Sequence, residues 1–469
     1  MRFEARFKPA PWLIAGGLAC ASALGVQAPA QAPAGTLAPQ LTLAPASPVS
    51  VGSPSKPAAG APAPSAPAAL VLTLTQAAQR ARANSVAFQA AVTAVGTAQD
   101  VHTQARAALF PALSNQDAYY FTQDNVYVAN DGPHEFVTWG DVRETLDWGS
   151  RAAVRQARAG VALAQAQQDI ASRGLFATVV QDYFTLASAG RKLATARQAL
   201  ADAQQYLKDS EALENAGQAA HADVIQAQLQ VSQRVSGLAQ AQQAQEDARL
   251  GLAVLLFPTF NQNFSVVDTL DQPPPLPPEP QVLASAGLTN PIMSSAKSAL
   301  VQAKEGVTIA HAALLPSASL SYTYGIDAHE YALFNQYHRS NLGSAVTGTL
   351  SIPLFDWGAN RAKLHMAQLA EKQSERALSS TQRQLQASLI AGYDQARTAY
   401  NNLAQLANSR DLAAESLRLV ALRYRDGEAT ILELVSAQDA LVLARDAYDN
   451  GQVDYRVALA NLQTLTGTY

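Results

Sequence analysis

The residues that could do chemistry are sparse and scattered along this 469-residue chain. It has seven histidines and one cysteine, and it contains no glycine-rich phosphate loop, HExxH zinc motif or nucleophile elbow. Two carboxylates do share a spacing. Asp223 lies six residues after Gly217, and Glu433 lies six residues after Gly427. The sequence therefore predicts no enzyme, no cofactor and no metal site, and it leaves a repeated glycine-to-acid spacing to be explained.

The bulk composition narrows the class of protein. The formal net charge is −4, so the chain lacks the basic footprint of a nucleic-acid-binding protein. Only 15% of residues are charged and 7% are aromatic, while alanine and glutamine recur through long stretches. This composition is typical of extended helices packed through small side chains.

The first 28 residues have the features of a secretory signal peptide. Arg2, Arg6 and Lys8 are basic, and Trp12 to Leu24 is an apolar run too short to span a bilayer. We therefore expect residues 1–28 to direct export across the inner membrane.

Cys20 has two interpretations. It follows Leu18-Ala19, as the acylated cysteine of a lipoprotein would, although Gly17 replaces the aliphatic residue expected there. Ala21-Ser22-Ala23 instead offers an ordinary cleavage site, after which the cysteine is discarded. Residues 29–71 are rich in alanine and proline and predict a disordered tether.

The chain contains an internal repeat. Three landmarks recur in the same order, at offsets of 205, 209 and 210 residues: Ala107–Pro111 with Ala312–Pro316, Leu146–Gly149 with Phe355–Gly358, and Gly217–Gln228 with Gly427–Gln438. Chance does not preserve order and offset at three separate places, so each half is one structural unit used twice. The first repeat spans 72–257, a proline-rich linker spans 258–281, and the second repeat spans 282–469.

Each repeat changes its hydrophobic period twice. Alternating apolar and polar residues predict strands, most clearly at 317–327. Apolar residues spaced every 3.5 positions on average predict long helices, as in the seam of Leu389, Tyr393 and Ala396. The expected strands are at about 112–124, 136–147, 317–327 and 342–354. The expected long helices are at about 150–216, 218–257, 360–426 and 428–466, preceded by a helix from Thr73 or Thr75 to about Leu109.

The four strands are long enough to cross a membrane when tilted, but too few to close a barrel. Ten residues of alternating pattern is the length of a transmembrane strand, and the smallest membrane barrels have eight strands. Open sheet edges in lipid leave backbone groups unsatisfied, so we expect the chain to oligomerise. Three copies would supply twelve strands, and a helix of about 67 residues would extend roughly 100 Å beyond them.

These features resemble the TolC family of outer-membrane efflux proteins. The resemblance rests on the two hairpin-plus-helix repeats, the Leu354–Gly358 strand exit, the Arg423–Gly427 turn and the closing stretch Asp454–Gly467. It implies a mainly helical fold with a small β part, in which a homotrimer forms a twelve-stranded outer-membrane barrel continued by a periplasmic α-helical coiled-coil barrel. It also implies a passive exit duct of a tripartite efflux pump or of a type I secretion system, which works with a periplasmic adaptor, an inner-membrane pump and outer-membrane lipid.

The resemblance assigns roles to the acids after the two glycines. Family members narrow at the periplasmic tip through a ring of acidic side chains, and here Asp223 and Glu433 take those positions. Gln226 and Ser436 replace the family's second acidic residue, which implies a weaker constriction. Helix capping is the competing interpretation for Glu433, because Thr430 precedes it by three residues, whereas the sequence offers Asp223 no such partner.

The remaining assignments follow from position. Tyr424 matches a family residue that helps to hold the tips closed, with packing between helices as the alternative. Trp148 and Trp357, at the two strand-to-helix exits, are expected in a membrane-interface girdle, with core packing as the alternative. The adaptor is expected to contact the tip turns, which comprise Gly217, Gln218, His221, Gly427, Glu428 and Thr430.

A soluble periplasmic coiled-coil adaptor or scaffold without a pore is the other function that long heptads allow. The alternating strands favour the membrane duct, because a soluble adaptor has no need of a lipid-facing sheet.

Overall fold

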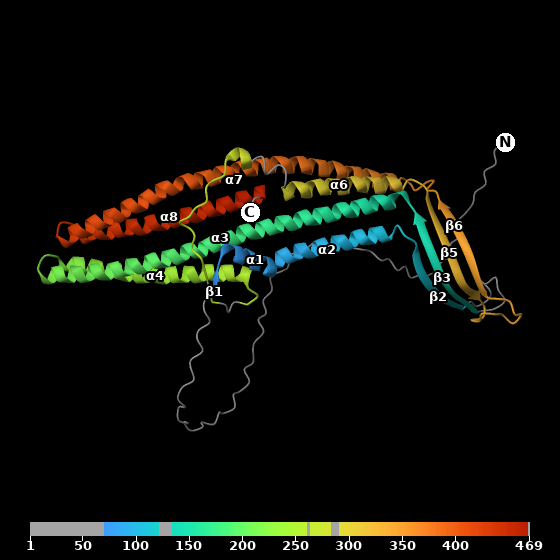
Figure 1. Ribbon diagram of the computed structural model, residues 1–469, viewed down its shortest axis with the longest axis horizontal. Helices are drawn as coiled ribbons and strands as arrows, with labels where there is room; N and C mark the ends of the chain where they lie inside the picture. Colours follow the sequence, from blue (N-terminus) through green and yellow to red (C-terminus); the bar gives the residue numbers. More distant parts are fainter. Residues whose placement is uncertain (1–69, 122–133, 260–262, 283–289, 468–469) are drawn as a thin grey trace, which may run out of the picture. The chain divides into compact units, whose positions relative to one another are not determined.

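The computed structural model describes residues 70–121, 134–259, 263–282 and 290–467 (Figure 1). The predicted signal peptide, Cys20 and most of the predicted tether lie outside these residues, as does the end of the strand expected at 112–124. No helix among the described residues is long and apolar enough to span a bilayer.

The predicted mainly helical, duplicated fold is confirmed. The first repeat contains α1 (Leu74–Asn84), α2 (Val86–Ala107), β2 (Ala112–Phe121), β3 (His134–Leu146), α3 (Trp148–Asn215) and α4 (His221–Leu256). The second contains α6 (Pro291–Ala312), β5 (Ser317–Ala328), β6 (Leu342–Ser351), α7 (Ala359–Arg425) and α8 (Ile431–Thr466). Two short strands, β1 (Leu70–Leu72) and β4 (Phe264–Val266), pair in parallel.

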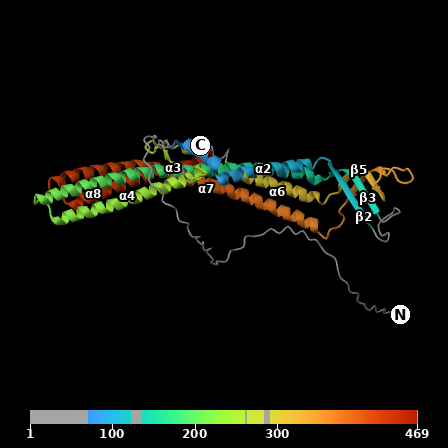
Figure 2. The same ribbon diagram turned by 90° about the horizontal axis from the view of Figure 1, so that it is seen from below.

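The helices pack lengthwise, with α3 at the centre. It contacts α2 and α4 of its own repeat and α6 and α8 of the other, while α7 packs on α6 and α8 (Figures 1 and 2). The predicted seam is buried at Leu389, Tyr393 and Ala396, and opposite it Leu434, Leu441, Tyr455 and Leu462 are each at most 7% exposed. Heptad spacing therefore marks the faces along which α7 and α8 meet.

The sheet joins the two repeats edge to edge. Its order is β2-β3-β5-β6, and every neighbouring pair is antiparallel. Leu320, Tyr322 and Tyr324 alternate along β5, and each remains between 44% and 53% exposed. β5 thus presents a row of apolar side chains on one face of the sheet, and the rest of the described chain leaves this row uncovered.

Two boundaries expected from the sequence are wrong, one of a helix and one of a strand. The single helix expected up to Leu109 is two helices, because Ser85 is extended and its hydroxyl caps α2 at the Phe88 N–H, while the Asn84 amide donates to the Leu256 carbonyl. The last strand stops at Ser351 instead of 354, since proline at 353 cannot donate a ladder hydrogen bond.

The linker between repeats lies against the helices. We call residues 263–282 the strap. Leu270 is fully buried in a cluster with Leu72, Tyr183 and Leu252, and Val282 is buried beside Tyr393 of α7. The strap therefore contacts elements of both repeats.

Candidate functional site

The two tips are built by the same backbone motif. At the end of α3, Gly217 has φ +72°, its N–H donates to Glu214, and the Gln218 N–H reaches back to Leu213. At the end of α7, Gly427 has φ +74° and the Glu428 N–H reaches back to Arg423. This is a Schellman cap, which needs a residue in the left-handed region and hence favours glycine. The following helices begin at His221 and Ile431, three residues later than expected from the sequence.

The carboxylates of Asp223 and Glu433 differ in their hydrogen bonds, and the difference is the reverse of the capping expected from the sequence. The Asp223 carboxylate accepts a hydrogen bond from the Ala220 N–H at 3.3 Å, so it does cap its helix. Thr430 caps the other helix through its own hydroxyl, which accepts the Glu433 N–H at 3.3 Å. The Glu433 side chain is exposed and, among the described residues, has no hydrogen-bond partner. Asp223 lacks a side-chain partner at Ala220, but the Ala220 backbone N–H binds its carboxylate instead. Glu433 therefore has the less constrained of the two carboxylates.

Tyr424 joins the two tip hairpins inside one chain. Its hydroxyl lies 2.6 Å from the Ser210 hydroxyl of α3, and its ring is 4% exposed. Burial raises the pKa of Tyr424, against the effect of the Ser210 hydrogen bond, so the hydroxyl stays neutral. One residue on, the Arg425 guanidinium lies 3.8 Å from the Asp209 carboxylate. Tyr424 thus both packs between helices and hydrogen-bonds across them.

The tip residues proposed for partner contact are all accessible. Gln218, His221, Glu428 and Thr430 are exposed, and the His221 ring nitrogen lies 2.8 Å from the Glu214 carboxylate. These side chains leave both turns open to a partner.

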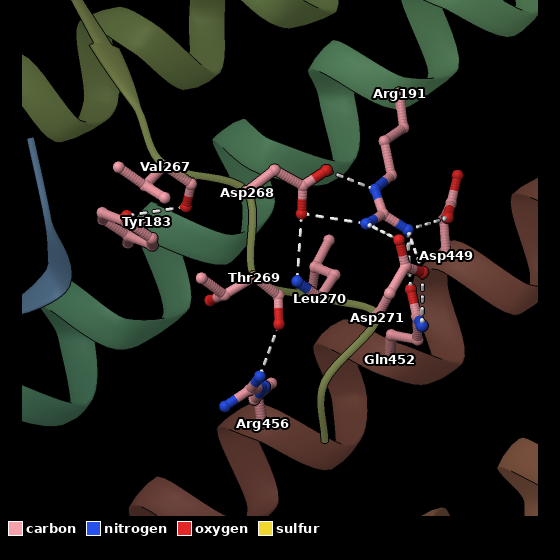
Figure 3. Close-up of polar contacts among 10 residues, drawn as sticks. All are labelled: Tyr183, Arg191, Val267, Asp268, Thr269, Leu270, Asp271, Asp449, Gln452 and Arg456. Atoms are coloured by element: carbon pink, nitrogen blue, oxygen red, sulfur yellow. Dashed lines mark hydrogen bonds and ion pairs between the residues drawn. The ribbon is translucent and has the colours of Figure 1, made fainter. Parts of the chain in front are cut away.

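A second polar site lies midway along α3, where Figure 3 shows carboxylates converging on one arginine. We call Arg191, Asp268, Asp271, Asp449 and Gln452 the Arg191 cluster. The guanidinium donates to Asp268 and Asp271 of the strap, with the Nη2 bonds at 3.0 Å and 2.7 Å, and to Asp449 and Gln452 of α8 at 3.4 Å and 3.1 Å. One side chain of the first repeat therefore binds the linker and the last helix together.

The charges in the Arg191 cluster stabilise one another. Burial opposes the charge on Arg191, but hydrogen bonds to Asp268 and Asp271 outweigh it and raise its pKa. The Arg191 hydrogen bond holds the pKa of Asp271 below its usual value, whereas burial raises the pKa of Asp449. Arg191 stays charged, and the planar guanidinium suits several carboxylates at once.

Further hydrogen bonds fix the strap beside this cluster. The Tyr183 hydroxyl donates to the carbonyls of Leu72 and Val267, at 3.1 Å and 2.8 Å. From α8, Arg456 donates to the carbonyls of Thr269 and Gln272. These side chains satisfy backbone oxygens of a segment that has little secondary structure of its own.

A groove of about 480 Å³ lies between α3, α4 and α8, next to the Arg191 cluster. Lys192 donates to Asn450 across it at 2.7 Å, and Asp446 lines its wall. Burial raises the pKa of Asp446, and Lys192 opposes that shift. The groove contains isolated charges without a grouped set of reacting side chains.

The strand-to-helix exits expose both tryptophans. Trp148 is 70% exposed and Trp357 is 91% exposed, so neither packs in the core of the chain. The exits differ in length: only Asp147 separates β3 from α3, whereas seven residues separate β6 from α7. Trp357 has φ +56° and stacks edge-on against Phe355 at 4.9 Å.

The sequence did not reveal Arg191 or Ser210 as functional candidates. Each is a common residue inside a long helix. The partner of Arg191, Asp268, lies 77 positions away in the sequence, and the partner of Ser210, Tyr424, lies 214 positions away. The one local signal was the pair Asp268 and Asp271, two of the three acids in the linker. In the described ranges, no three His, Cys, Asp or Glu side chains group as metal ligands.

Comparison with known proteins agrees with the fold. OprJ, an outer membrane protein of Pseudomonas aeruginosa, is 32% identical over 160 residues, which is 33% of this chain and about a third (32%) of OprJ. OpmQ of Pseudomonas putida, a pyoverdine export outer membrane protein, is 25% identical over 350 residues, covering 72% of this chain and 68% of OpmQ. The CmeC outer membrane channel of Campylobacter jejuni has the same fold, with a TM-score of 0.74 at 17% identity over 84% of this chain and 85% of CmeC.

The family match covers both repeats and leaves out most of the strap. Residues 77–256 and 282–468 match the family described as outer membrane efflux protein, whose members are transport proteins of the outer membrane and not enzymes. On this match, with the duplicated hairpin-and-helix fold beneath it, the chain belongs to the outer membrane efflux protein family.

Proposed function

We propose that this chain is a passive exit duct of the outer membrane, formed by three copies and opened at its periplasmic tips by an adaptor protein. The observation that carries the proposal is the four-stranded sheet with an exposed apolar row along β5, continued by helices of 68 and 67 residues. Such helices extend about 100 Å, enough to carry a passage well beyond the membrane.

The edges of the sheet support an assembly of several copies. Strands β2 and β6 each pair on one side only within the described chain. In lipid each unpaired backbone group costs several kcal/mol, so the edges need a partner, and further copies of the same sheet provide one. Three copies give a closed sheet with an even number of strands.

The tips support a gate. Six hairpin ends would meet in a trimer, with Glu433 and Asp223 presented just past each turn and Tyr424 holding neighbouring hairpins together. A ring of carboxylates favours cations in a narrow passage. The exposed turn residues, from Gln218 to His221 and from Glu428 to Thr430, are the proposed adaptor contacts, with an inner-membrane pump behind the adaptor.

Membrane fractionation and planar-bilayer recording test the duct. The full chain should require detergent for extraction and should give stepwise currents in bilayers. Recovery in the soluble periplasmic fraction would favour the pore-free adaptor instead and would overturn the proposal.

The gate is tested by neutralising one acid at a time. Glu433→Gln should raise conductance and reduce cation selectivity more than Asp223→Asn, because the Asp223 carboxylate is already bound to a backbone N–H. Glu375→Gln, an exposed acid on α7 about 50 residues from the tip and so roughly 75 Å away, is the matched control. Equal currents in all three variants would show that neither acid contributes to the gate.

A further inference from the structure

The two strand-to-helix exits share a pattern that transport does not require. Trp148 is followed three residues later by Arg151, and Trp357 is followed four residues later by Arg361. Leu146 precedes the first pair at 61% exposure, and Leu354 precedes the second at 91%. Each exit thus places an apolar side chain, a tryptophan and an arginine in sequence at the end of the sheet, on the outside of the chain.

The arginines at the exits carry uncommitted charge. Arg151 and Arg361 are exposed, and across the described residues neither has an ion pair or hydrogen bond. The nearby acids are engaged by the backbone: Asp147 accepts the Gly149 N–H at 3.0 Å, and Asp356 accepts two backbone N–H groups at 3.0 Å and 2.7 Å. The aspartates are therefore occupied as helix caps and leave the guanidinium groups available.

Other positive charge gathers at the same level. Arg106 lies in the last turn of α2, which leads into the sheet, and Lys363 lies in the first turns of α7. Both are exposed, and neither has an ion pair or hydrogen bond in the described part of the chain. Of the acids that the structure describes at these exits, Glu144, near the end of β3, is the one not engaged in this way. The four cations Arg106, Arg151, Arg361 and Lys363 stand against the three carboxylates Asp147, Asp356 and Glu144, so these residues leave one positive charge in excess at the edge of the sheet that faces the helices.

We propose that the exits bind the phosphate groups of anionic phospholipids through Arg151 and Arg361, with Trp148 and Trp357 anchored beside them at the membrane surface. This inference rests on the proposed insertion of the sheet into the membrane. Tryptophan favours the bilayer interface, and arginine can lay its apolar stem on the membrane while its guanidinium donates paired hydrogen bonds to phosphate. The surplus positive charge is complementary to the anionic headgroups.

Tryptophan quenching by brominated lipids tests the proposal on the full chain. The protein, carrying Trp12→Phe and Trp139→Phe so that Trp148 and Trp357 are its remaining tryptophans, is reconstituted in phosphatidylcholine mixed with brominated phosphatidylglycerol or with brominated phosphatidylcholine. Phosphatidylglycerol should quench better, by about fivefold in relative binding constant for each arginine, and salt should weaken the preference.

Paired variants separate headgroup binding from other causes. Arg151→Gln with Arg361→Gln should remove the preference, whereas Arg151→Lys with Arg361→Lys should keep most of it. Arg197→Gln with Arg383→Gln is the matched control, because it removes two exposed arginines of the same helices far from the exits.

The outcomes distinguish this inference from the proposed function. Quenching by both lipids with no preference for phosphatidylglycerol overturns headgroup binding and leaves the duct intact. Absence of quenching by either lipid contradicts membrane insertion itself. A glutamine variant that loses oligomer stability but keeps the phosphatidylglycerol preference assigns the arginines to contacts between copies and also overturns the proposal.

Discussion

The contacts between the two repeats differ between the middle of α3 and its tip. In the middle, Arg191 donates to four side chains, and Arg456 and Tyr183 bind the strap on either side of it. At the very ends of α3 and α7, the polar links to the second repeat among the described residues are one hydroxyl pair and one ion pair at 3.8 Å, both from adjacent residues of α7. The next links, the Arg234–Asp439 ion pair and the Gln438 amide that donates to the Ala199 carbonyl, lie further from the tip. The chain therefore has a firmly bound middle and a lightly bound end, which suits a tip that opens while the rest of the helices stay in place.

The largest effect is expected from removing the centre of the firm region. Arg191→Ala should lower the free energy of unfolding by about 3 kcal/mol, because it leaves the buried Asp449 without its cation. Urea unfolding in detergent, followed by circular dichroism, measures this. Arg418→Ala removes an exposed pair with Glu415 and should cost less than about 0.5 kcal/mol. Similar losses in the two variants would mean that the middle is no firmer than the surface.

A smaller effect is expected at the lightly bound end. Tyr424→Phe removes the hydroxyl that contacts Ser210 and should cost about 1 kcal/mol, confined to the tip. Hydrogen exchange at the two turns should speed up, while exchange around Arg191 stays unchanged. Tyr206→Phe is the matched control, since its hydroxyl has no hydrogen bond within the described residues. Faster exchange throughout the helices would show that tip and middle open as one unit.

The sequence predicted the repeated elements better than the contacts between them. The heptad seam on α7, the glycine turns and the alternating residues of β5 are local patterns, and each placed its element within a few residues. The break at Ser85 was missed because it depends on Asn84 donating to Leu256, a residue 172 positions away. The other boundaries shifted by three residues for local reasons: Pro353 ends the last strand, and the caps at Ala220 and Thr430 set the starts of the helices after the tips.

Only the part of the candidate site that requires a particular backbone conformation could be predicted from the sequence. The tip turns follow from two glycines that must adopt positive φ. The Arg191 cluster joins an unremarkable helix residue to two aspartates in the linker and one in the last helix, so its signal lies in no single window of sequence. The capping of Asp223 was misjudged for a related reason, since the donor is the backbone N–H of Ala220 and has no side-chain signature.

The smallest predicted effect tests the border of the firm region, where α8 meets the groove. Burial raises the pKa of Asp446, so its charged form is disfavoured in the folded chain, and stability is lost as pH rises from the unfolded pKa through the raised folded one. Asp446→Asn lacks that penalty. It should therefore be slightly more stable than the native chain at neutral pH, by a few tenths of a kcal/mol, and the difference should vanish as pH falls toward about 4.

Urea midpoints of the native chain and the variant across this pH range measure the difference. Asp454→Asn, at an exposed acid on the same helix, is the matched control. A variant less stable than the native chain at neutral pH would mean that the Asp446 charge is held by Lys192 as a structural pair. The firm region would then extend across the groove from the Arg191 cluster to α4, and less of the helical hairpin would be free to move with the tip.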